Sequence, residues 1–298
     1  MLLIAGGLLD PNLQTLVDAA QSLGVECVDW RLPAGASPPF HWDLSVPDAI
    51  PPWGGDTCPQ GVFIRHDVFA AIDDPRSAVA QRALGWFTAV QGWIMAHPQV
   101  RSFNADMSAV ALNKPAALLR ARHAGLQIPP TWVSNHTPLM RERLALPAIA
   151  KPVAGGGLCQ TLDEALEGIT STYSAMPALI QPRLIAPELR VFVVGQDSFA
   201  FEVSSPSLDY RALQDAQVRR VPMPSVIGPL RALMQDLRMD FGAADFKTDP
   251  SSGELVFLEL NTSPMFVRFD QTSEGQLAAS MVKHLIGTNA PTLRAPQQ

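Results

Sequence analysis

The stretch ELVFLELNTSP, Glu254 to Pro264, decides the fold prediction for this chain. It is typical of a β-strand because valine, phenylalanine and leucine fill it, yet Glu259 and Asn261 carry oxygen atoms near its end. Side chains two positions apart in a strand point to the same face of the sheet. Glu259 and Asn261 therefore share one face, and this arrangement predicts a ligand that binds oxygen atoms.

The residues before this strand predict its hairpin partner. The sequence GAADFKTDPSSGELVFLELN indicates two antiparallel strands around the turn at 249–253. Symmetric pairing places Asp245 opposite Glu259, where two like charges destabilise a sheet and raise each other's pKa unless a cation lies between them. Oxygens of Asp, Glu and Asn suit Mg²⁺, with phosphate completing its shell. The alternative, two solvated carboxylates on an exposed face, leaves Asn261 without a role.

Composition restricts the class of protein. The chain has 298 residues, is 47% hydrophobic and 17% charged, and carries a net charge of −6, which is typical of a folded protein with two or three lobes. It has no basic cluster, so we expect no nucleic-acid partner. Its three cysteines are far apart, as in a reducing cytoplasm. The apolar start lacks a basic leader and no apolar run reaches about 18 residues, so we expect no membrane partner.

The first hundred residues predict an α/β lobe. A strand at 1–7, a helix at 11–24 and a strand at 25–30 form a β-α-β opening. Beyond it the pattern predicts a short strand near 40–45, a strand at 61–67, a helix over 73–95 and a short strand at 101–104.

The remaining residues alternate strands and helices differently. Asn113 and Pro115 predict a new helix start within 108–125, with Asn113 as its cap. The other predicted elements are strands at 131–135, 146–152 and 177–184, helices at 161–174, 228–239 and 273–287, and a hairpin over 188–205.

A lysine and a glycine loop end one apolar strand. Lys151 stands just before Gly155, Gly156 and Gly157. Backbone N–H groups of such a loop can cradle phosphate oxygens, and a lysine beside them supplies a point charge. The pattern is not a P-loop, since no Lys-Ser or Lys-Thr pair follows the glycines. Taken alone, an ordinary glycine turn with a surface lysine explains it equally well.

Three further cations gain meaning only together. Lys114 opens a helix, Arg190 lies in the strand LRVFVV, and Arg211 lies in LDYR. Each one by itself is explained as a solvated or ion-paired residue. Around a carboxylate–amide metal site they would neutralise a nucleotide triphosphate, whose charge one Mg²⁺ does not cancel.

An apolar segment precedes the arginine strand. Residues 178–184 could offer backbone groups to adenine, and Glu188 could bind a ribose hydroxyl, although physics alone does not distinguish the segment from a linker. Its candidate contacts are Gln181, Pro182, Arg183 and Leu184.

The order of these features resembles the ATP-grasp superfamily from about Ser102 to Gly287. It is most similar to the graspetide (microviridin-type) synthetases and the ribosomal-protein glutamate ligases. LDYR resembles the Asp-Trp-Arg step of the graspetide enzymes, while the strand ending Asn-x-Ser-Pro is nearer the glutamate-ligase type. The resemblance implies an α/β fold with α+β lobes. Its parts would be a pre-ATP-grasp domain (1–100), a central subdomain with the glycine loop (101–184), a C-terminal subdomain with the metal site (185–288) and a tail (289–298).

The resemblance also implies an activity, an ATP-dependent carboxylate–amine ligase. A substrate carboxylate would attack the γ-phosphate of ATP, and an amine or hydroxyl would displace phosphate from the resulting acylphosphate to give an amide or ester. Catalysis of this kind depends on positioning and electrostatics. The resemblance implies that Lys114, Lys151 and the glycine loop bind phosphates, and that 178–184 and Glu188 bind adenine and ribose. It also implies that Asp245, Glu259 and Asn261 bind one or two Mg²⁺. Arg190 and Arg211 would stabilise the transferred phosphoryl group.

The substrate stays open at this point. A peptide and a pair of small amino acids are both compatible with the pattern, as are a phosphotransferase and a regulatory nucleotide-binding protein that has lost catalysis. Arg65 and Arg268 are candidate substrate contacts, and each is equally well explained as a strand-end or surface residue. We expect a cytoplasmic protein and leave a homodimer open.

Overall fold

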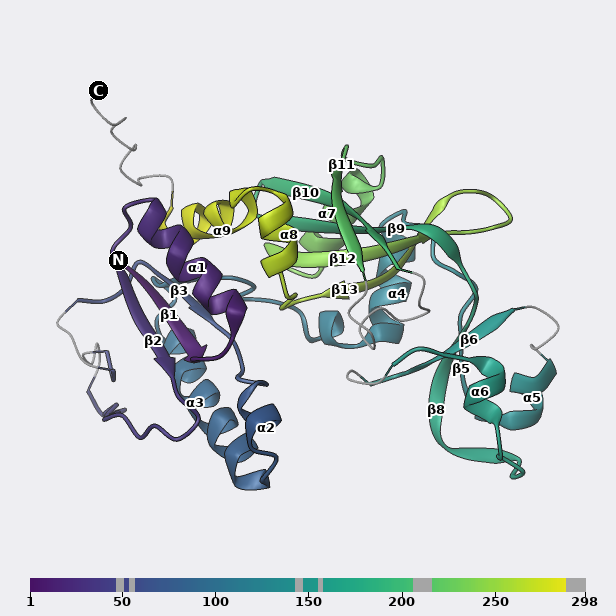
Figure 1. Cartoon of the computed structure of the whole chain (residues 1–298), viewed down its shortest axis with the longest axis horizontal. Helices are drawn as coiled ribbons and strands as arrows, with labels where there is room; N and C mark the ends of the chain where they lie inside the picture. Colours follow the sequence, from purple (N-terminus) through teal and green to yellow (C-terminus); the bar gives the residue numbers. More distant parts are fainter. Residues whose placement is uncertain (47–50, 54–56, 143–146, 155–157, 206–215, 288–298) are drawn as a thin grey trace. The chain divides into compact units, whose positions relative to one another are not determined.

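The computed structural model describes residues 1–46, 51–53, 57–142, 147–154, 158–205 and 216–287 (Figure 1). The chain forms two compact units. The first unit contains residues 1–105 and the stretch that starts at Met265, and the second contains residues 106–264. Among the described residues, no helix has the length and apolar character that crossing a membrane requires.

The first unit is built on a parallel sheet, which confirms the predicted β-α-β opening. Its strand order is β2-β1-β3-β4. Four consecutive side chains of the central strand are almost fully buried, from Leu2 to Ala5, as expected for a parallel strand covered on both faces. The strands are β1 (Leu2–Gly7), β2 (Cys27–Leu32), β3 (Gly61–Ile64) and β4 (Arg101–Ser102).

Helices cover both faces of this sheet. Leu3 and Ala5 pack with Trp93 of α3, while α1 and α9 contact β1 from its other face (Figure 1). The helices are α1 (Pro11–Ser22), α2 (Ala70–Asp73), α3 (Ser77–Ala96), α8 (Val267–Thr272) and α9 (Gln276–Ile286).

Two predictions for this unit are corrected. The helix expected over 73–95 begins at Ser77, because Asp74 precedes Pro75 and is held extended, at φ −137° and ψ 98°. Residues 40–45 form no strand. Phe40 and Trp42 are partly buried and pack against the core cluster that contains Trp93, instead of joining the sheet.

The second unit contains a four-stranded antiparallel sheet in the order β5-β8-β6-β7. Its covered face packs Ala150 and Ile180 against Leu162. The helix predicted over 161–174 is shorter, since Gly168 adopts a left-handed φ of 71° and a strand begins at Tyr173. The elements are β5 (Trp132–His136), α5 (Thr137–Glu142), β6 (Ala148–Pro152), β7 (Gln160–Thr161), α6 (Leu162–Leu166) and β8 (Tyr173–Pro182).

The second unit also contains a five-stranded antiparallel sheet in the order β11-β10-β9-β12-β13, which confirms both predicted hairpins. The helices α4 and α7 pack their apolar side chains on one face of it, against Val191, Ala244 and Leu260 (Figure 1). The elements are η1 (Ala109–Leu112), α4 (Lys114–His123), β9 (Ile185–Val194), β10 (Asp197–Ser204), β11 (Gln217–Val221), α7 (Ile227–Asp236), β12 (Phe241–Thr248) and β13 (Leu255–Asn261).

The last two helices belong to the first unit. The side-chain oxygen Oδ1 of Asn12 accepts a hydrogen bond from the backbone N–H of Phe266 at 2.7 Å, and the rings of Phe63 and Phe266 meet at 6.3 Å. The division at residues 100, 184 and 288 that the sequence predicts remains a proposal.

Candidate functional site

The β12–β13 hairpin brings the two predicted metal-binding carboxylates together. Asp245 pairs directly with Glu259, and Ala243 pairs with Asn261. The pairs nearer the turn do not follow the symmetric register, because a shift lies between Asp245 and Phe246. The alignment that the sequence predicts for Asp245 and Glu259 is therefore confirmed, with a β-bulge that the sequence did not indicate.

Asp245 is the most strongly bound group of the site. Both of its carboxylate oxygens accept hydrogen bonds from Arg190, at 2.6 Å from Nε and 2.7 Å from Nη2. The Asn261 amide donates to Asp245 Oδ2 at 3.3 Å. Asp245 is only 5% exposed, so this bidentate pair lies in a largely dehydrated setting where charge-assisted bonds are strong. The guanidinium takes the place beside Asp245 that a cation would need.

Glu259 faces a different cation. The Lys114 ammonium lies 3.4 Å from Glu259 Oε2. Lys114 opens α4, whose cap is the Asn113 side chain accepting from the Ala116 N–H at 3.1 Å, so the predicted helix start is confirmed. Glu259 and Asn261 also line a cavity of about 170 Å³ with Lys114 and Val153. A lysine, a carboxylate and an amide side chain thus line one cavity.

Lys151, on β6, is another cation of the site. It follows Ala150 on β6, so it points away from the face on which Ala150 packs with α6. Burial lowers the pKa of Lys151, and the charge of Glu259 counteracts that effect in part. No ion pair within 4.0 Å connects Lys151 to a carboxylate that the structure describes. A partly buried ammonium of this kind favours an anionic ligand.

Glu188 and Lys247 extend the charged surface along the same sheet. They are register partners on β9 and β12, and their charged atoms lie 2.9 Å apart. Burial raises the pKa of Glu188, while Lys247 opposes the shift. Sequence reasoning missed Lys247. Its signal was available, because it lies two positions after Asp245 and so shares its face.

The predicted adenine segment ends β8 and leads into β9. Gln181 is buried, and its amide donates to Thr131 Oγ1 at 2.9 Å, while its Oε1 has no hydrogen-bond partner among the described residues. The backbone N–H of Arg183 donates a hydrogen bond to the backbone oxygen of Pro147 at 2.7 Å. A buried acceptor with no partner could receive a ligand N–H group.

Not all predicted site residues can be placed in this arrangement. Arg65 and Arg268 belong to the first unit, where Arg65 is buried and forms an ion pair with Asp10 at 2.9 Å. Four further candidates, Gly155, Gly156, Gly157 and Arg211, lie outside the described residues.

The donor chemistry fits a hard cation better than a transition metal. Asp245, Glu259 and Asn261 supply oxygen atoms from adjacent positions of two strands. Within the described ranges, no three residues of the types His, Cys, Asp and Glu cluster closely enough to form a metal centre by themselves. Phosphate oxygens would have to complete such a shell.

The architecture was compared with proteins of known structure. One is the ligase PsnB in complex with a phosphomimetic variant of its minimal precursor, Mg and ADP. It is 18% identical, with a TM-score of 0.73 over 95% of this chain and 98% of the other. This chain has the ATP-grasp fold. A RiPP-associated ATP-grasp ligase from Chryseobacterium gregarium, in complex with ADP and a leader and core peptide, is 20% identical with a TM-score of 0.71, over 95% and 96% of the two chains.

Sequence comparison agrees with the ATP-grasp fold over a shorter stretch. D-alanine--D-alanine ligase B of Xanthomonas campestris pv. campestris is 30% identical over 147 residues, which are 41% of this chain. The match spans only 44% of the length of that relative. No protein-family model matches the chain.

Proposed function

We propose that this protein is an ATP-dependent carboxylate–amine ligase that activates its substrate as an acylphosphate. The observation that carries the proposal is the direct pairing of Asp245 and Glu259 beside Lys151, a cation with no described carboxylate partner. The ATP-grasp fold supports it, since PsnB with the same fold binds Mg and ADP.

The residues around the paired carboxylates have separate roles in this proposal. Lys114 and Lys151 bind the phosphates of ATP, and the segment 178–184 with Glu188 binds its nucleoside. Asp245, Glu259 and Asn261 would hold one or two Mg²⁺ ions, which would supply positive charge to the transferred phosphoryl group. Arg190 holds Asp245 through one hydrogen bond to each carboxylate oxygen, which leaves a lone pair on those oxygens for a metal and places the guanidinium where a phosphoryl or acyl oxygen would also bind.

The proposed reaction balances in two steps. A substrate carboxylate oxygen attacks the γ-phosphorus, and the bond to the β–γ bridging oxygen breaks to release ADP. An amine then attacks the acyl carbon, phosphate leaves, and the amine loses a proton. The cations of the site stabilise the phosphoryl oxygens in both steps, and no protein nucleophile is needed.

We propose a peptide as the carboxylate substrate. The solved structures with this fold include ligases in complex with a precursor peptide or with a leader and core peptide. The match to a D-alanine--D-alanine ligase favours small amino acids as the second candidate. We place the protein in the cytoplasm and leave its assembly to a measurement of the molecular mass in solution.

Hydroxylamine trapping tests this proposal. The chain is incubated with Mg²⁺, ATP and hydroxylamine, and with either a library of Asp- and Glu-rich peptides or a pool of free amino acids. We expect ADP release together with peptide hydroxamates detected by mass spectrometry. Hydroxamates from free amino acids alone would replace the peptide assignment by the second candidate.

Two other outcomes would contradict the ligase. A stable phosphorylated product without hydroxamate would indicate a phosphotransferase. Nucleotide binding without ADP release under either substrate mixture would indicate a regulatory nucleotide-binding protein.

A further inference from the structure

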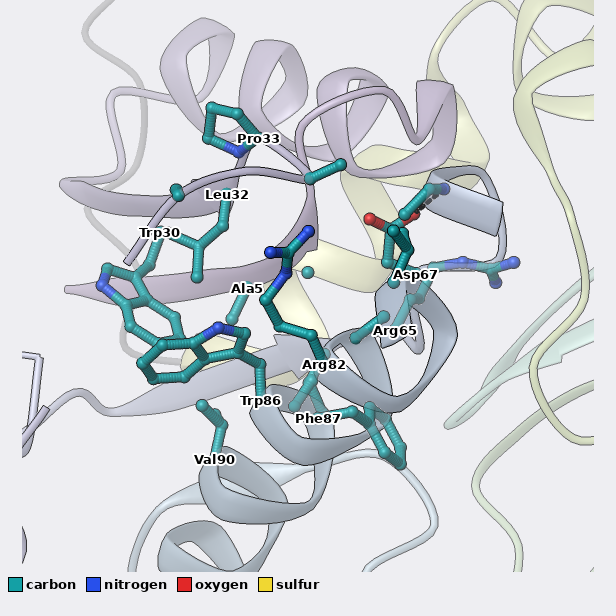
Figure 2. A pocket seen from close by; sticks show the side chains of 17 residues that line it. Ala5, Trp30, Leu32, Pro33, Arg65, Asp67, Arg82, Trp86, Phe87 and Val90 are labelled. Atoms are coloured by element: carbon teal, nitrogen blue, oxygen red, sulfur yellow. Dashed lines mark hydrogen bonds between the residues drawn. The ribbon is translucent and has the colours of Figure 1, made fainter. Parts of the chain in front are cut away.

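The first unit contains a pocket of its own, between its parallel sheet and α3 (Figure 2). Trp30, Trp86 and Val90 form apolar walls, and the two indole rings meet edge to face at 5.6 Å. The accessible space of about 40 Å³ accommodates a group of a few carbon atoms. Leu32, the last residue of β2, and Pro33 also line the pocket.

Topology places this pocket where a parallel sheet offers a binding crevice. The strand order is β2-β1-β3-β4, so the chain leaves β1 toward one edge and leaves β3 toward the other. Connections that depart in opposite directions open a crevice at the carboxyl ends of the strands. The pocket is lined there by Gly6 of β1 and by Ile64 and Arg65 at the end of β3.

Two of the three charged residues that line the pocket are already engaged. Arg65 points away from it, in its ion pair with Asp10 (Figure 2). Asp67 Oδ1 accepts hydrogen bonds from the backbone N–H groups of Phe69 and Ala70, both at 3.0 Å, at the start of α2. Neither charge is available to a ligand without breaking a structural contact.

Arg82 differs from both. It extends from α3 among the lining residues, beside the apolar walls (Figure 2). No hydrogen bond or ion pair connects it to any side chain that the structure describes. The pocket therefore combines an apolar interior with one cation that has no bound partner in the described part of the chain.

We propose that this pocket binds a carboxylate that bears a short aliphatic group. The Arg82 guanidinium binds the carboxylate through parallel N–H donors, and Trp30 and Trp86 contact the aliphatic group. A free amino acid and the carboxyl-terminal residue of a peptide share this chemistry. None of the residues proposed to bind ATP or Mg²⁺ lines this pocket, so its occupancy can be tested separately from the ligase reaction.

Tryptophan fluorescence provides a direct measurement, since two indoles line the pocket. The full chain is titrated with N-acetyl-leucine, which imitates a peptide terminus, with leucine, and with the uncharged N-acetyl-leucinamide. We expect saturable quenching by at least one acid and binding of the amide about tenfold weaker, as for a lost charge-assisted hydrogen bond. Tighter binding of N-acetyl-leucine than of leucine assigns the peptide terminus, and the reverse assigns the free amino acid.

Variants distinguish binding in the pocket from a general effect of the protein's charge. Arg82→Gln should weaken binding of the acid about tenfold and leave the amide unchanged. Arg76→Gln is the matched control, because Arg76 is exposed like Arg82 and forms an ion pair with Asp74, but does not line the pocket. Ala83→Leu narrows the pocket beside Arg82 and should weaken binding of acid and amide alike.

Three results would overturn the proposal. They are equal affinity of acid and amide, unchanged acid binding in Arg82→Gln, and no saturable signal from either acid. Nucleotide affinity, measured in parallel, should not change in Arg82→Gln, so a failed pocket assignment remains distinguishable from a failed ligase assignment.

Discussion

The two hairpins of the five-stranded sheet differ in how regularly they pair. In β9–β10 the register runs without interruption from Val194 opposite Asp197 to Glu188 opposite Val203. In β12–β13 the register shifts by one residue next to Asp245. The regular hairpin supplies Arg190 and Glu188, and the irregular one supplies the paired carboxylates.

The bulge decides which face Glu259 occupies. Phe257 and Leu260 both pack in the core under α4 and α7, although they are three positions apart. Strict alternation from Phe257 would send Glu259 to that same core face. The bulge accommodates the extra residue, Leu258, so Phe257 and Leu260 are both buried while Glu259 lies opposite Asp245. The strand thus keeps an apolar core face and a charged face despite the added residue.

The largest expected effect follows from the charge of Glu259. Glu259→Gln keeps the size of the side chain but removes a negative charge from the proposed metal site, so we expect ADP release to fall by about a hundredfold or more. Steady-state ADP release at saturating Mg²⁺ measures it. The control is Glu254→Gln, on the exposed turn side of the same hairpin. Near-normal turnover in Glu259→Gln would mean that the bulged hairpin holds no metal.

Substitution of Lys151 should have the next largest effect. Lys151→Met should weaken ATP binding about thirtyfold, because a partly buried ammonium loses its interaction with the phosphates. Calorimetric titration with a non-hydrolysable ATP analogue measures the affinity. Lys283→Met, an exposed lysine on α9, is the control and should bind normally.

The lowered pKa of Lys151 also predicts a pH dependence. As pH rises through that lowered pKa, Lys151 of the free protein loses its positive charge, so ATP affinity should fall. Bound phosphates favour the charged ammonium, so ATP binding should be accompanied by uptake of a proton in this pH range. The unfolded chain keeps the ordinary lysine pKa and binds more protons there, so the free energy of unfolding contributed by Lys151 increases with pH over the same interval. Absence of proton uptake in buffers of different ionisation enthalpy would contradict a phosphate role for Lys151.

Deleting Leu258 tests the bulge itself. Removal of this residue turns β12–β13 into a regular hairpin in which Asp245 still faces Glu259, so we expect ADP release to fall by only about tenfold through altered strand twist. Circular dichroism should show a retained fold. A loss as large as that of Glu259→Gln would show that the twist of the bulge is itself required.

The smallest effect concerns the helix that carries Lys114. Asn113→Ala removes the cap of α4 and should lower the free energy of unfolding by about 1 kcal/mol. Denaturant unfolding measures this change, and the ATP affinity should decrease only slightly. Thr161→Ala at the capping box of α6 provides a comparison cap away from Lys114.

Sequence patterns predicted local features of the fold better than tertiary ones. The two hairpins, the Asn113 cap and the pairing of Asp245 with Glu259 all depend on alternation and turn chemistry over short distances. The bulge at Leu258 was not predictable, because it results from packing of Phe257 and Leu260 under helices distant in sequence. The bidentate hold of Arg190 on Asp245 was missed for the same reason, since it depends on the register between β9 and β12.

The assignment of α8 and α9 to the first unit has a consequence for synthesis on the ribosome. Residues 106–264 emerge as one uninterrupted segment and can fold before translation ends. The amino-terminal sheet must wait much longer, because α9 fits so closely that a side chain at Gly61 would meet the backbone oxygen of Leu285. We therefore expect the apolar strand β1, which precedes the second unit in the chain, to complete its packing only after α9 has been made.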